Sequence, residues 1–219
     1  MNENNSKKRI IETQKEPEIE GYIPVKLNTE RGIIHCRYYQ TDTNSAAIYV
    51  GGIGGGFDTP SNELYPYLST KLQLEGISSL RIRFRNPRSL EESAYDVIAG
   101  IEFLENEGIS QIALVGHSLG GAVVIQAAVD SKSVKTVVTL ATQSYGSDIV
   151  KDLSENTSIL LIHGNDDSVL PASCSRTIYG IAHEPKERVL LSGNGHCLEE
   201  SADEVKKIAH EWILKELNP

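Results

Sequence analysis

The chain has 219 residues, of which 39% are hydrophobic and 23% charged, a composition typical of a globular protein with one domain of ordinary size. Its formal net charge of −9 leaves no excess of Lys and Arg to neutralise phosphates, which argues against nucleic-acid binding. No stretch reaches the roughly 18 to 20 apolar residues of a membrane span. The polar N-terminal segment also lacks the apolar core of a secretory signal, so a cytoplasmic protein is expected.

The cysteines predict neither a disulfide framework nor a metal site. Cys36, Cys174 and Cys197 are odd in number and lie far apart, without the paired spacing of zinc ligands. We expect three free thiols, and the sequence calls for no metal and no cofactor.

The first part of the chain is expected to be a tail followed by short strands. Residues 1–20 mix both charge signs with Asn and Gln, which predicts a polar, flexible tail, and residues 21–219 are assigned to the folded domain. Strand-like runs follow at 22–28 and 32–40, joined by a Thr-Glu-Arg-Gly turn that suits a hairpin.

Beyond the third strand, at 46–50, strand-like and helix-like segments alternate. Further strands are expected at 77–84, 111–116, 134–141, 158–164 and 187–193. Amphipathic or small-residue helices are expected at 61–76, 89–108, 119–130 and 201–219. This order predicts an α/β fold with about eight strands, in which a mostly parallel sheet carries helices on both faces.

The pentapeptide Gly116-His117-Ser118-Leu119-Gly120 stands between a buried strand and a helix. Glycines two residues either side of a serine allow a tight, strained turn that leaves the hydroxyl above the sheet edge. The helix that begins there directs its free N–H groups toward Ser118. The alternative is that Ser118 only caps the helix. Its position between strand and helix favours a nucleophile.

These features resemble the α/β-hydrolase superfamily, and in particular its small lidless serine esterases and its dienelactone-hydrolase-like or serine-aminopeptidase-like members. The resemblance covers nearly all of residues 21–217. It implies a catalytic triad in the chain order serine, acid, histidine, with the acid after the seventh strand and the histidine after the eighth.

Residues of the required types occur at both places. Asp167 follows the strand at 158–164 and is followed by Leu170 and Pro171, the register common for the acid, whereas Asp166 fits a turn or cap role better. His196 lies in a glycine-containing loop after the last strand. The other histidines are assigned structural or solvated roles: His35, His117, His163, His183 and His210.

A run of glycines at 51–56 follows the third strand. The lysine and hydroxyl of a phosphate-binding loop are absent, and Arg83 and Arg85 stand where a dinucleotide fold needs an acid. By register with the superfamily, the backbone N–H groups of Ile53 and Leu119 would form the oxyanion hole. The sequence departs from the family at Gly51, where histidine is frequent.

Arginines mark the strand at 77–84 and the loop beyond it. Arg81, Arg83 and Arg85 alternate along the chain. The favoured explanation is pairing with acids of the next helix, such as Glu91, Glu92 or Asp96, or extension of the charged groups to solvent. A sharper hypothesis is that Arg85 or Arg88 lines the substrate pocket and selects anionic substrates.

The predicted function is hydrolysis of a small soluble carboxylic ester by Ser118, His196 and Asp167 through an acyl-enzyme. The partner is then a small-molecule acyl substrate. Residues 142–157, between two predicted strands, are too few for a large helical lid. The alternatives are a thioesterase, a peptidase or amidase with the same triad, or a binding protein that keeps the fold without the activity.

Overall fold

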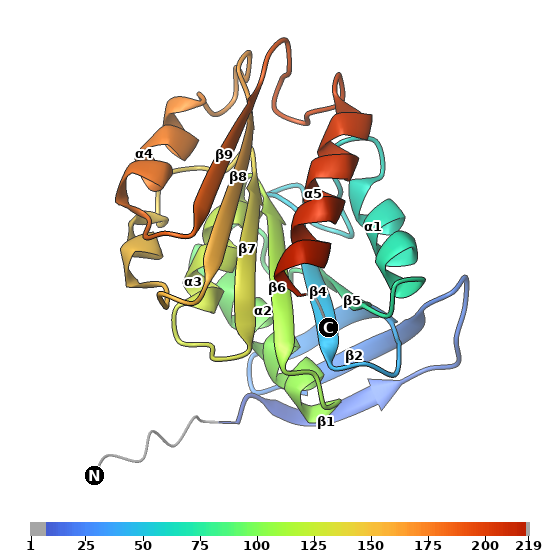
Figure 1. The fold of residues 1–219 in the computed structure, drawn as a ribbon. Helices are drawn as coiled ribbons and strands as arrows, with labels where there is room; N and C mark the ends of the chain where they lie inside the picture. Colours follow the sequence, from blue (N-terminus) through green and yellow to red (C-terminus); the bar gives the residue numbers. More distant parts are fainter. Residues whose placement is uncertain (1–7, 218–219) are drawn as a thin grey trace.

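The computed structural model describes residues 8–217 and is built on one sheet with helices packed on its faces (Figure 1). In these residues the strands are β1 Ile10–Lys15, β2 Ile23–Thr29, β3 Gly32–Tyr39, β4 Ser45–Val50, β5 Ser78–Arg83, β6 Gln111–His117, β7 Val134–Leu140, β8 Ser158–Gly164 and β9 Lys186–Leu191. The helices are α1 Leu64–Gln73, α2 Leu90–Asn106, α3 Leu119–Ala128, α4 Ser173–Ile181 and α5 Ala202–Glu216, with a 3₁₀ turn η1 at Asp148–Asp152.

The sheet begins antiparallel and continues parallel. Its order is β1-β2-β3-β5-β4-β6-β7-β8-β9. β2 and β3 form the expected hairpin, in which Thr29 pairs with Gly32, and β3 pairs antiparallel with β5. From β5 to β9 all neighbouring strands are parallel, so their carboxyl ends share one edge of the sheet.

The expected tail is wrong over residues 10–15, which form β1 and add a ninth strand to the eight anticipated. β1 pairs antiparallel with β2 at the sheet edge, and only Ile10 among its residues is buried. The Glu102 carboxylate of α2 accepts the backbone N–H groups of Arg9 and Ile10 at 3.0 and 3.2 Å. Such a strand stays polar because almost all of it faces water, and its sequence therefore looks like a tail. Residues 1–7 lie outside the described part of the chain.

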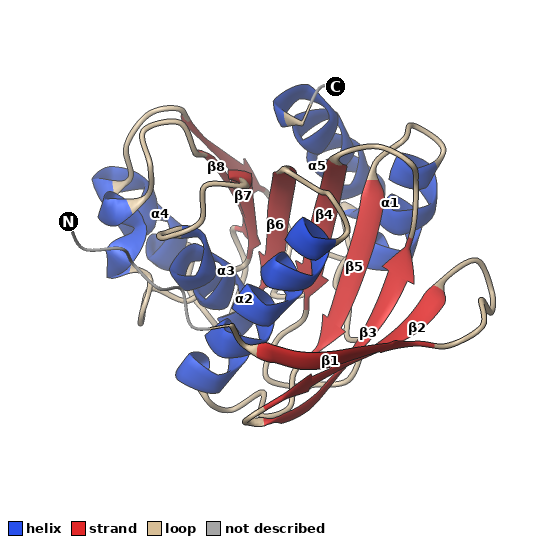
Figure 2. Ribbon diagram, turned by 90° about the horizontal axis from the view of Figure 1, so that it is seen from below, coloured by secondary structure: helices blue, strands red, loops and turns tan. Residues whose placement is uncertain are grey.

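Two hydrophobic clusters hold the helices to opposite faces of the sheet. Helices α1 and α5 cover one face and α2, α3 and α4 the other, as the two views show (Figures 1 and 2). Along β6, Ile112 and Leu114 join the cluster of α2 and α3, while Ala113 and Val115 join that of α1 and α5. The strand is buried on both sides, which explains its unbroken apolar run.

A capping serine and two acidic residues stabilise the start of α2. The hydroxyl of Ser89 accepts the backbone N–H of Glu92 at 3.2 Å, and Glu91 and Glu92 occupy the positive first turn of the helix. Ser89 and Glu92 thus have the Ser-x-x-Glu spacing that is typical of a capped helix start. Among residues 8–217 no helix combines the length and the apolar character that crossing a bilayer requires.

Candidate active site

The loops that leave the carboxyl ends of β4, β6, β8 and β9 meet at one edge of the sheet. They carry, in that order, the glycine run, Ser118, Asp167 and His196. Parallel α/β sheets bind their ligands at this edge.

Ser118 occupies a strained turn between β6 and α3. Its φ of 56° and ψ of −120° are unusual for a residue with a side chain, and its backbone N–H donates to Leu140 O of β7 at 2.9 Å. Its side chain makes no cap hydrogen bond to α3. The explanation of Ser118 as a mere helix cap is therefore wrong.

The two flanking glycines are required by close backbone packing. A Cβ at Gly116 would overlap the carbonyl of Gly120, and a Cβ at Gly120 would overlap the carbonyl of Gly51 in the glycine run. Both obstacles are backbone atoms, which cannot move aside without changing the turn. The Gly-x-Ser-x-Gly spacing is thus a steric condition for the observed conformation.

The carboxylate that binds His196 is that of Asp167. Its Oδ2 atom lies 2.7 Å from Nδ1 of His196, and the Asp167 side chain is buried. Asp166, the alternative left open by the sequence, is exposed, and its backbone N–H donates to Asn194 O at 3.0 Å. Gly164 lets these loops approach, because a Cβ there would overlap the Asn194 carbonyl.

Hydrogen bonds keep Asp167 ionised. The backbone N–H groups of Val169 and Leu170 both donate to Oδ1 at 2.8 Å. Burial works against the charged form, but the hydrogen bonds from His196, Leu170 and Val169 outweigh it, so the pKa of Asp167 lies below its ordinary value. An ionised acid can orient the imidazole of His196 and stabilise its positive charge.

The loop that carries His196 lies directly against the Ser118 turn. Nε2 of His117, the residue before Ser118, is 3.0 Å from the backbone carbonyl of His196, and the two imidazole rings have centroids 4.9 Å apart. The structure therefore brings the three loops of Ser118, Asp167 and His196 together.

The glycine run also contacts the serine turn. A Cβ on Gly52 would lie 3.2 Å from Cβ of Ser118, so the glycine run reaches the nucleophile candidate at the residue before Ile53. Within residues 8–217, neither the Ile53 nor the Leu119 amide N–H donates to a protein acceptor. Leu119 begins α3, where helix geometry leaves the N–H unpaired. Both amides are thus available to a ligand.

Of the two candidate substrate arginines, the structure brings only Arg88 toward the serine turn. A groove of about 490 Å³ reaches Leu119, the residue after Ser118, and is lined by Arg88, Leu90, Glu91, Leu119, Gln126, Gln143 and Tyr145. Arg85 instead donates to Asp96 Oδ1 at 2.6 Å and to Glu92 Oε2 at 2.8 Å. Its role is the ion pairing with α2 that the sequence also suggested, because buried Asp96 needs a cation. Arg85 does not line the groove, so its position does not support a contact with substrate.

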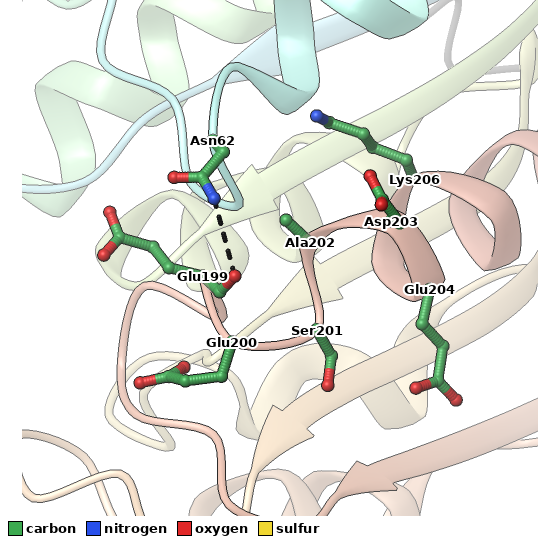
Figure 3. Close-up of a pocket in the computed structure, with 8 residues that line it drawn as sticks. All are labelled: Asn62, Glu199, Glu200, Ser201, Ala202, Asp203, Glu204 and Lys206. Carbon is green, nitrogen blue, oxygen red and sulfur yellow. Dashed lines mark hydrogen bonds between the residues drawn. The ribbon is translucent and has the colours of Figure 1, made fainter.

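A second hollow, of about 400 Å³, lies where the loop after His196 meets the start of α5 (Figure 3). Its lining residues are Asn62, Glu199, Glu200, Ser201, Ala202, Asp203, Glu204 and Lys206. None of them belongs to the triad.

Cys197, the residue after His196, is exposed. Desolvation of its thiol by the surrounding loop, together with the charges of Glu199 and other carboxylates, raises the pKa of this thiol. A raised pKa argues against a cysteine nucleophile.

Three residues that organise the site were given no such role from the sequence. His117 and His163 are buried and bind loop carbonyls, and buried Asn194 exchanges hydrogen bonds with Ser201. His163 lies near the end of the apolar strand β8, and Asn194 follows β9 closely, but no pattern in one sequence distinguishes such a polar residue from an ordinary strand end.

Comparisons with known proteins agree with this architecture. A family model described as the alpha/beta hydrolase family matches residues 61–197, whereas no curated protein matches the sequence. Dienelactone hydrolase from Anabaena variabilis superposes with a TM-score of 0.78 at 17% identity, covering 94% of this chain and 99% of the other.

Two further solved structures have the same fold. Est1E from Butyrivibrio proteoclasticus gives a TM-score of 0.75 at 15% identity over 90% of this chain and 99% of its own. A serine hydrolase without a lid from Xanthomonas campestris gives 0.72 at 15% identity, over 91% and 97% respectively. Because the family model spans more than half of the sequence, the chain belongs to the alpha/beta hydrolase family.

Proposed function

We propose that this protein is a serine hydrolase that cleaves a small, soluble carboxylic ester through Ser118, His196 and Asp167. The observation that carries the proposal is the strained Ser118 turn beside a histidine whose Nδ1 is held by a buried, ionised aspartate. A strain of this kind persists at functional sites because the surrounding structure imposes it.

The chemistry follows from these positions. His196 uses Nε2 to take the proton of the Ser118 hydroxyl as its oxygen attacks the ester carbonyl, and the N–H groups of Ile53 and Leu119 stabilise the resulting oxyanion. The alcohol leaves with the proton from His196. Water, activated by the same imidazole, then hydrolyses the acyl-enzyme and restores the Ser118 hydroxyl.

Two features favour a small, soluble ester. Between β7 and β8, residues 141–157 contain only the short turn η1, so no large helical lid covers the site. The groove beside Leu119 has a volume within the range of small-molecule sites. The similarity of the fold to that of a dienelactone hydrolase, an enzyme that cleaves an ester bond, favours an acyl ester over an amide.

Arg88 is the candidate for recognition of a negative charge on the substrate. Its side chain lines the groove, whereas Arg85 is held by carboxylates. We expect Arg88→Ala to lower kcat/KM for a carboxylate-bearing ester relative to an uncharged ester of equal size. Equal effects on both esters would remove Arg88 from substrate recognition.

The three cysteines, which are free thiols in the structure, support a reducing, cytoplasmic location.

A fluorophosphonate probe tests the nucleophile directly. We expect one adduct on the peptide that carries Ser118, no adduct in Ser118→Ala, and strongly reduced labelling in His196→Gln. The control is Ser173→Ala, which alters a serine at the start of α4 outside the triad. A folded wild-type protein that takes no label at Ser118 would favour a binding protein.

A substrate panel tests the bond that is cleaved. Para-nitrophenyl esters of increasing acyl length, matched thioesters and matched anilides are compared by kcat/KM. We expect the short soluble esters to be the best substrates. A preference for thioesters or anilides would retain the triad and replace the ester assignment.

A further inference from the structure

Two buried histidines beside the triad form the same unusual set of contacts. His117 is 5% exposed and His163 is fully buried. Nε2 of His117 lies 3.0 Å from the carbonyl oxygen of His196, and Nε2 of His163 lies 3.0 Å from that of Leu170. In each ring the other nitrogen, Nδ1, is buried without a hydrogen-bond partner.

These contacts define the protonation of both rings. A carbonyl oxygen only accepts hydrogen bonds, so Nε2 must carry the proton in each case. A second proton on Nδ1 would create a buried cation with an unpaired donor, which is unfavourable. Consistent with this, burial lowers the pKa of His117 to about 4. His117 is therefore a neutral donor at neutral pH, and in both rings the carbonyl partner fixes a proton on Nε2.

His163 acts on the acid of the triad. Its Nε2 faces Oδ2 of Asp167 at 3.3 Å, the same oxygen that binds His196. It also holds the carbonyl of Leu170, whose N–H donates to Oδ1 of Asp167. Three N–H groups, those of Val169, Leu170 and His196, thus donate to the carboxylate, and the His163 ring packs beside it while holding the Leu170 carbonyl.

His117 acts on the base. It precedes Ser118 directly, and its donor reaches the backbone of His196 while the two rings lie against each other. The strand end that presents the nucleophile is thereby tied to the loop that presents the imidazole. This loop comes from β9, which is not a neighbour of β6 in the sheet.

We propose that His117 and His163 are positioning residues that hold the base and the acid in register with Ser118. The inference rests on the proposed function of the triad. Neither ring exchanges protons with substrate: His163 fixes Asp167 and the turn around it, and His117 fixes the His196 loop to the serine turn. Displacing a catalytic group by about 1 Å costs about 100-fold in rate.

Substitutions that keep or remove the donor test the proposal. The amide of Gln places an N–H group near the position of Nε2, so His117→Gln and His163→Gln retain the hydrogen bond, whereas His117→Leu and His163→Leu remove it. Asn is polar but too short to reach the same carbonyl, and His163→Asn serves if His163→Leu does not fold. The matched control is His183→Leu, since His183 donates to Lys151 O at 2.7 Å on the surface.

We expect each Leu variant to lose about 100-fold in kcat with little change in KM, and each Gln variant to recover to within about tenfold of wild type. The control is expected to keep wild-type kcat. Folded Leu variants with wild-type kcat, or Gln variants as impaired as the Leu variants, would overturn the proposal.

A spectroscopic readout separates this proposal from the proposed function. The proton shared by His196 Nδ1 and Asp167 gives a strongly deshielded NMR signal when the pair is held in place. We expect that signal in wild type and His163→Gln and its loss in His163→Leu, whether or not any ester is cleaved. Its persistence in folded His163→Leu contradicts a positioning role. Absence of esterase activity with the expected signals contradicts only the triad's function.

Discussion

At the scale of single residues, the backbone of Ser118 shows how the site stores strain. Its φ of 56° is imposed by β6, α3 and the contact of its N–H with Leu140. Residues with a Cβ adopt such a conformation at a cost of order 1–3 kcal/mol. The turn is therefore less stable than a relaxed one would be, but it keeps the Ser118 hydroxyl accessible.

Glycine at position 118 is expected to relieve this strain. Ser118→Ala keeps a Cβ and the unfavourable φ, whereas Ser118→Gly removes both. We expect the free energy of unfolding of Ser118→Gly to exceed that of Ser118→Ala by about 1 kcal/mol, because strain relief outweighs the added flexibility of the unfolded chain. Urea unfolding of the two variants measures the difference. A glycine variant less stable than the alanine variant would show that the turn is unstrained.

The neutral state of buried His117 predicts a pH dependence of stability. Its folded pKa of about 4 lies below the ordinary value of 6.5, so the unfolded chain binds more protons between these pH values. Stability is therefore lost as pH falls from 6.5 to 4, by up to about 3 kcal/mol. In His117→Gln, the fall in free energy of unfolding between pH 7 and pH 4 should be smaller by that amount. Parallel stability curves for the two proteins would contradict this.

Sequence patterns pointed to the candidate site residues more directly than to the residues that hold them in place. Ser118 lies in a motif with a steric explanation, and Asp167 and His196 follow strands in the order that the family resemblance implies. His117 and His163 had no such signal, because what matters is an acceptor contributed by a distant or irregular segment. Whether Arg85 contacts substrate or pairs with an acid likewise depends on the position of Asp96 in the fold, which the sequence pattern does not give.

At the scale of elements, the junction of β6 and α3 depends on backbone contact rather than on side-chain packing. Gly120→Ala would force its Cβ into the carbonyl of Gly51, a collision with backbone that cannot be relieved by a rotamer change. We expect it to lower the free energy of unfolding by several kcal/mol, about 3 or more, in line with strain and overpacking penalties. Thermal or urea unfolding measures the loss.

Gly180→Ala in α4 is the matched control for that substitution. A Cβ at Gly180 meets nothing within 4 Å, and the residue is exposed near the end of the helix. Alanine is favoured over glycine in helices by up to about 1 kcal/mol, so the control should be neutral or stabilising. Equal destabilisation by the two substitutions would refute the steric account of the β6–α3 turn.

The strands that form the interior of the sheet were the most predictable elements, because burial on both faces gives them long apolar runs. β1 was missed for the opposite reason. One buried residue, Ile10, leaves no alternation of polar and apolar side chains, and the strand is held by the backbone ladder with β2 and by Glu102. Edge strands of this kind are specified by their neighbours.

At the scale of the whole molecule, the sheet leaves one edge open over the proposed triad. The 141–157 connection has no element larger than η1, so access does not depend on the movement of a lid. We expect the rate of hydrolysis of a short ester to follow simple saturation up to its solubility limit, without a jump when micelles form. A rise in rate at the critical micelle concentration, measured against detergent-free controls, would reveal interfacial activation and contradict an open site.

The place of the short β7–β8 connection has an evolutionary consequence. It leaves the carboxyl end of β7 beside the candidate site, where the Thr142 hydroxyl donates to the carbonyl of Ser118. It then enters the amino end of β8 at the opposite edge of the sheet, because the two strands are parallel. A helical cap grafted into this surface connection would change which molecules gain entry while every catalytic spacing is inherited intact. In such a scaffold, the range of substrates can therefore diverge through the length of the β7–β8 connection alone, while the reaction chemistry stays the same.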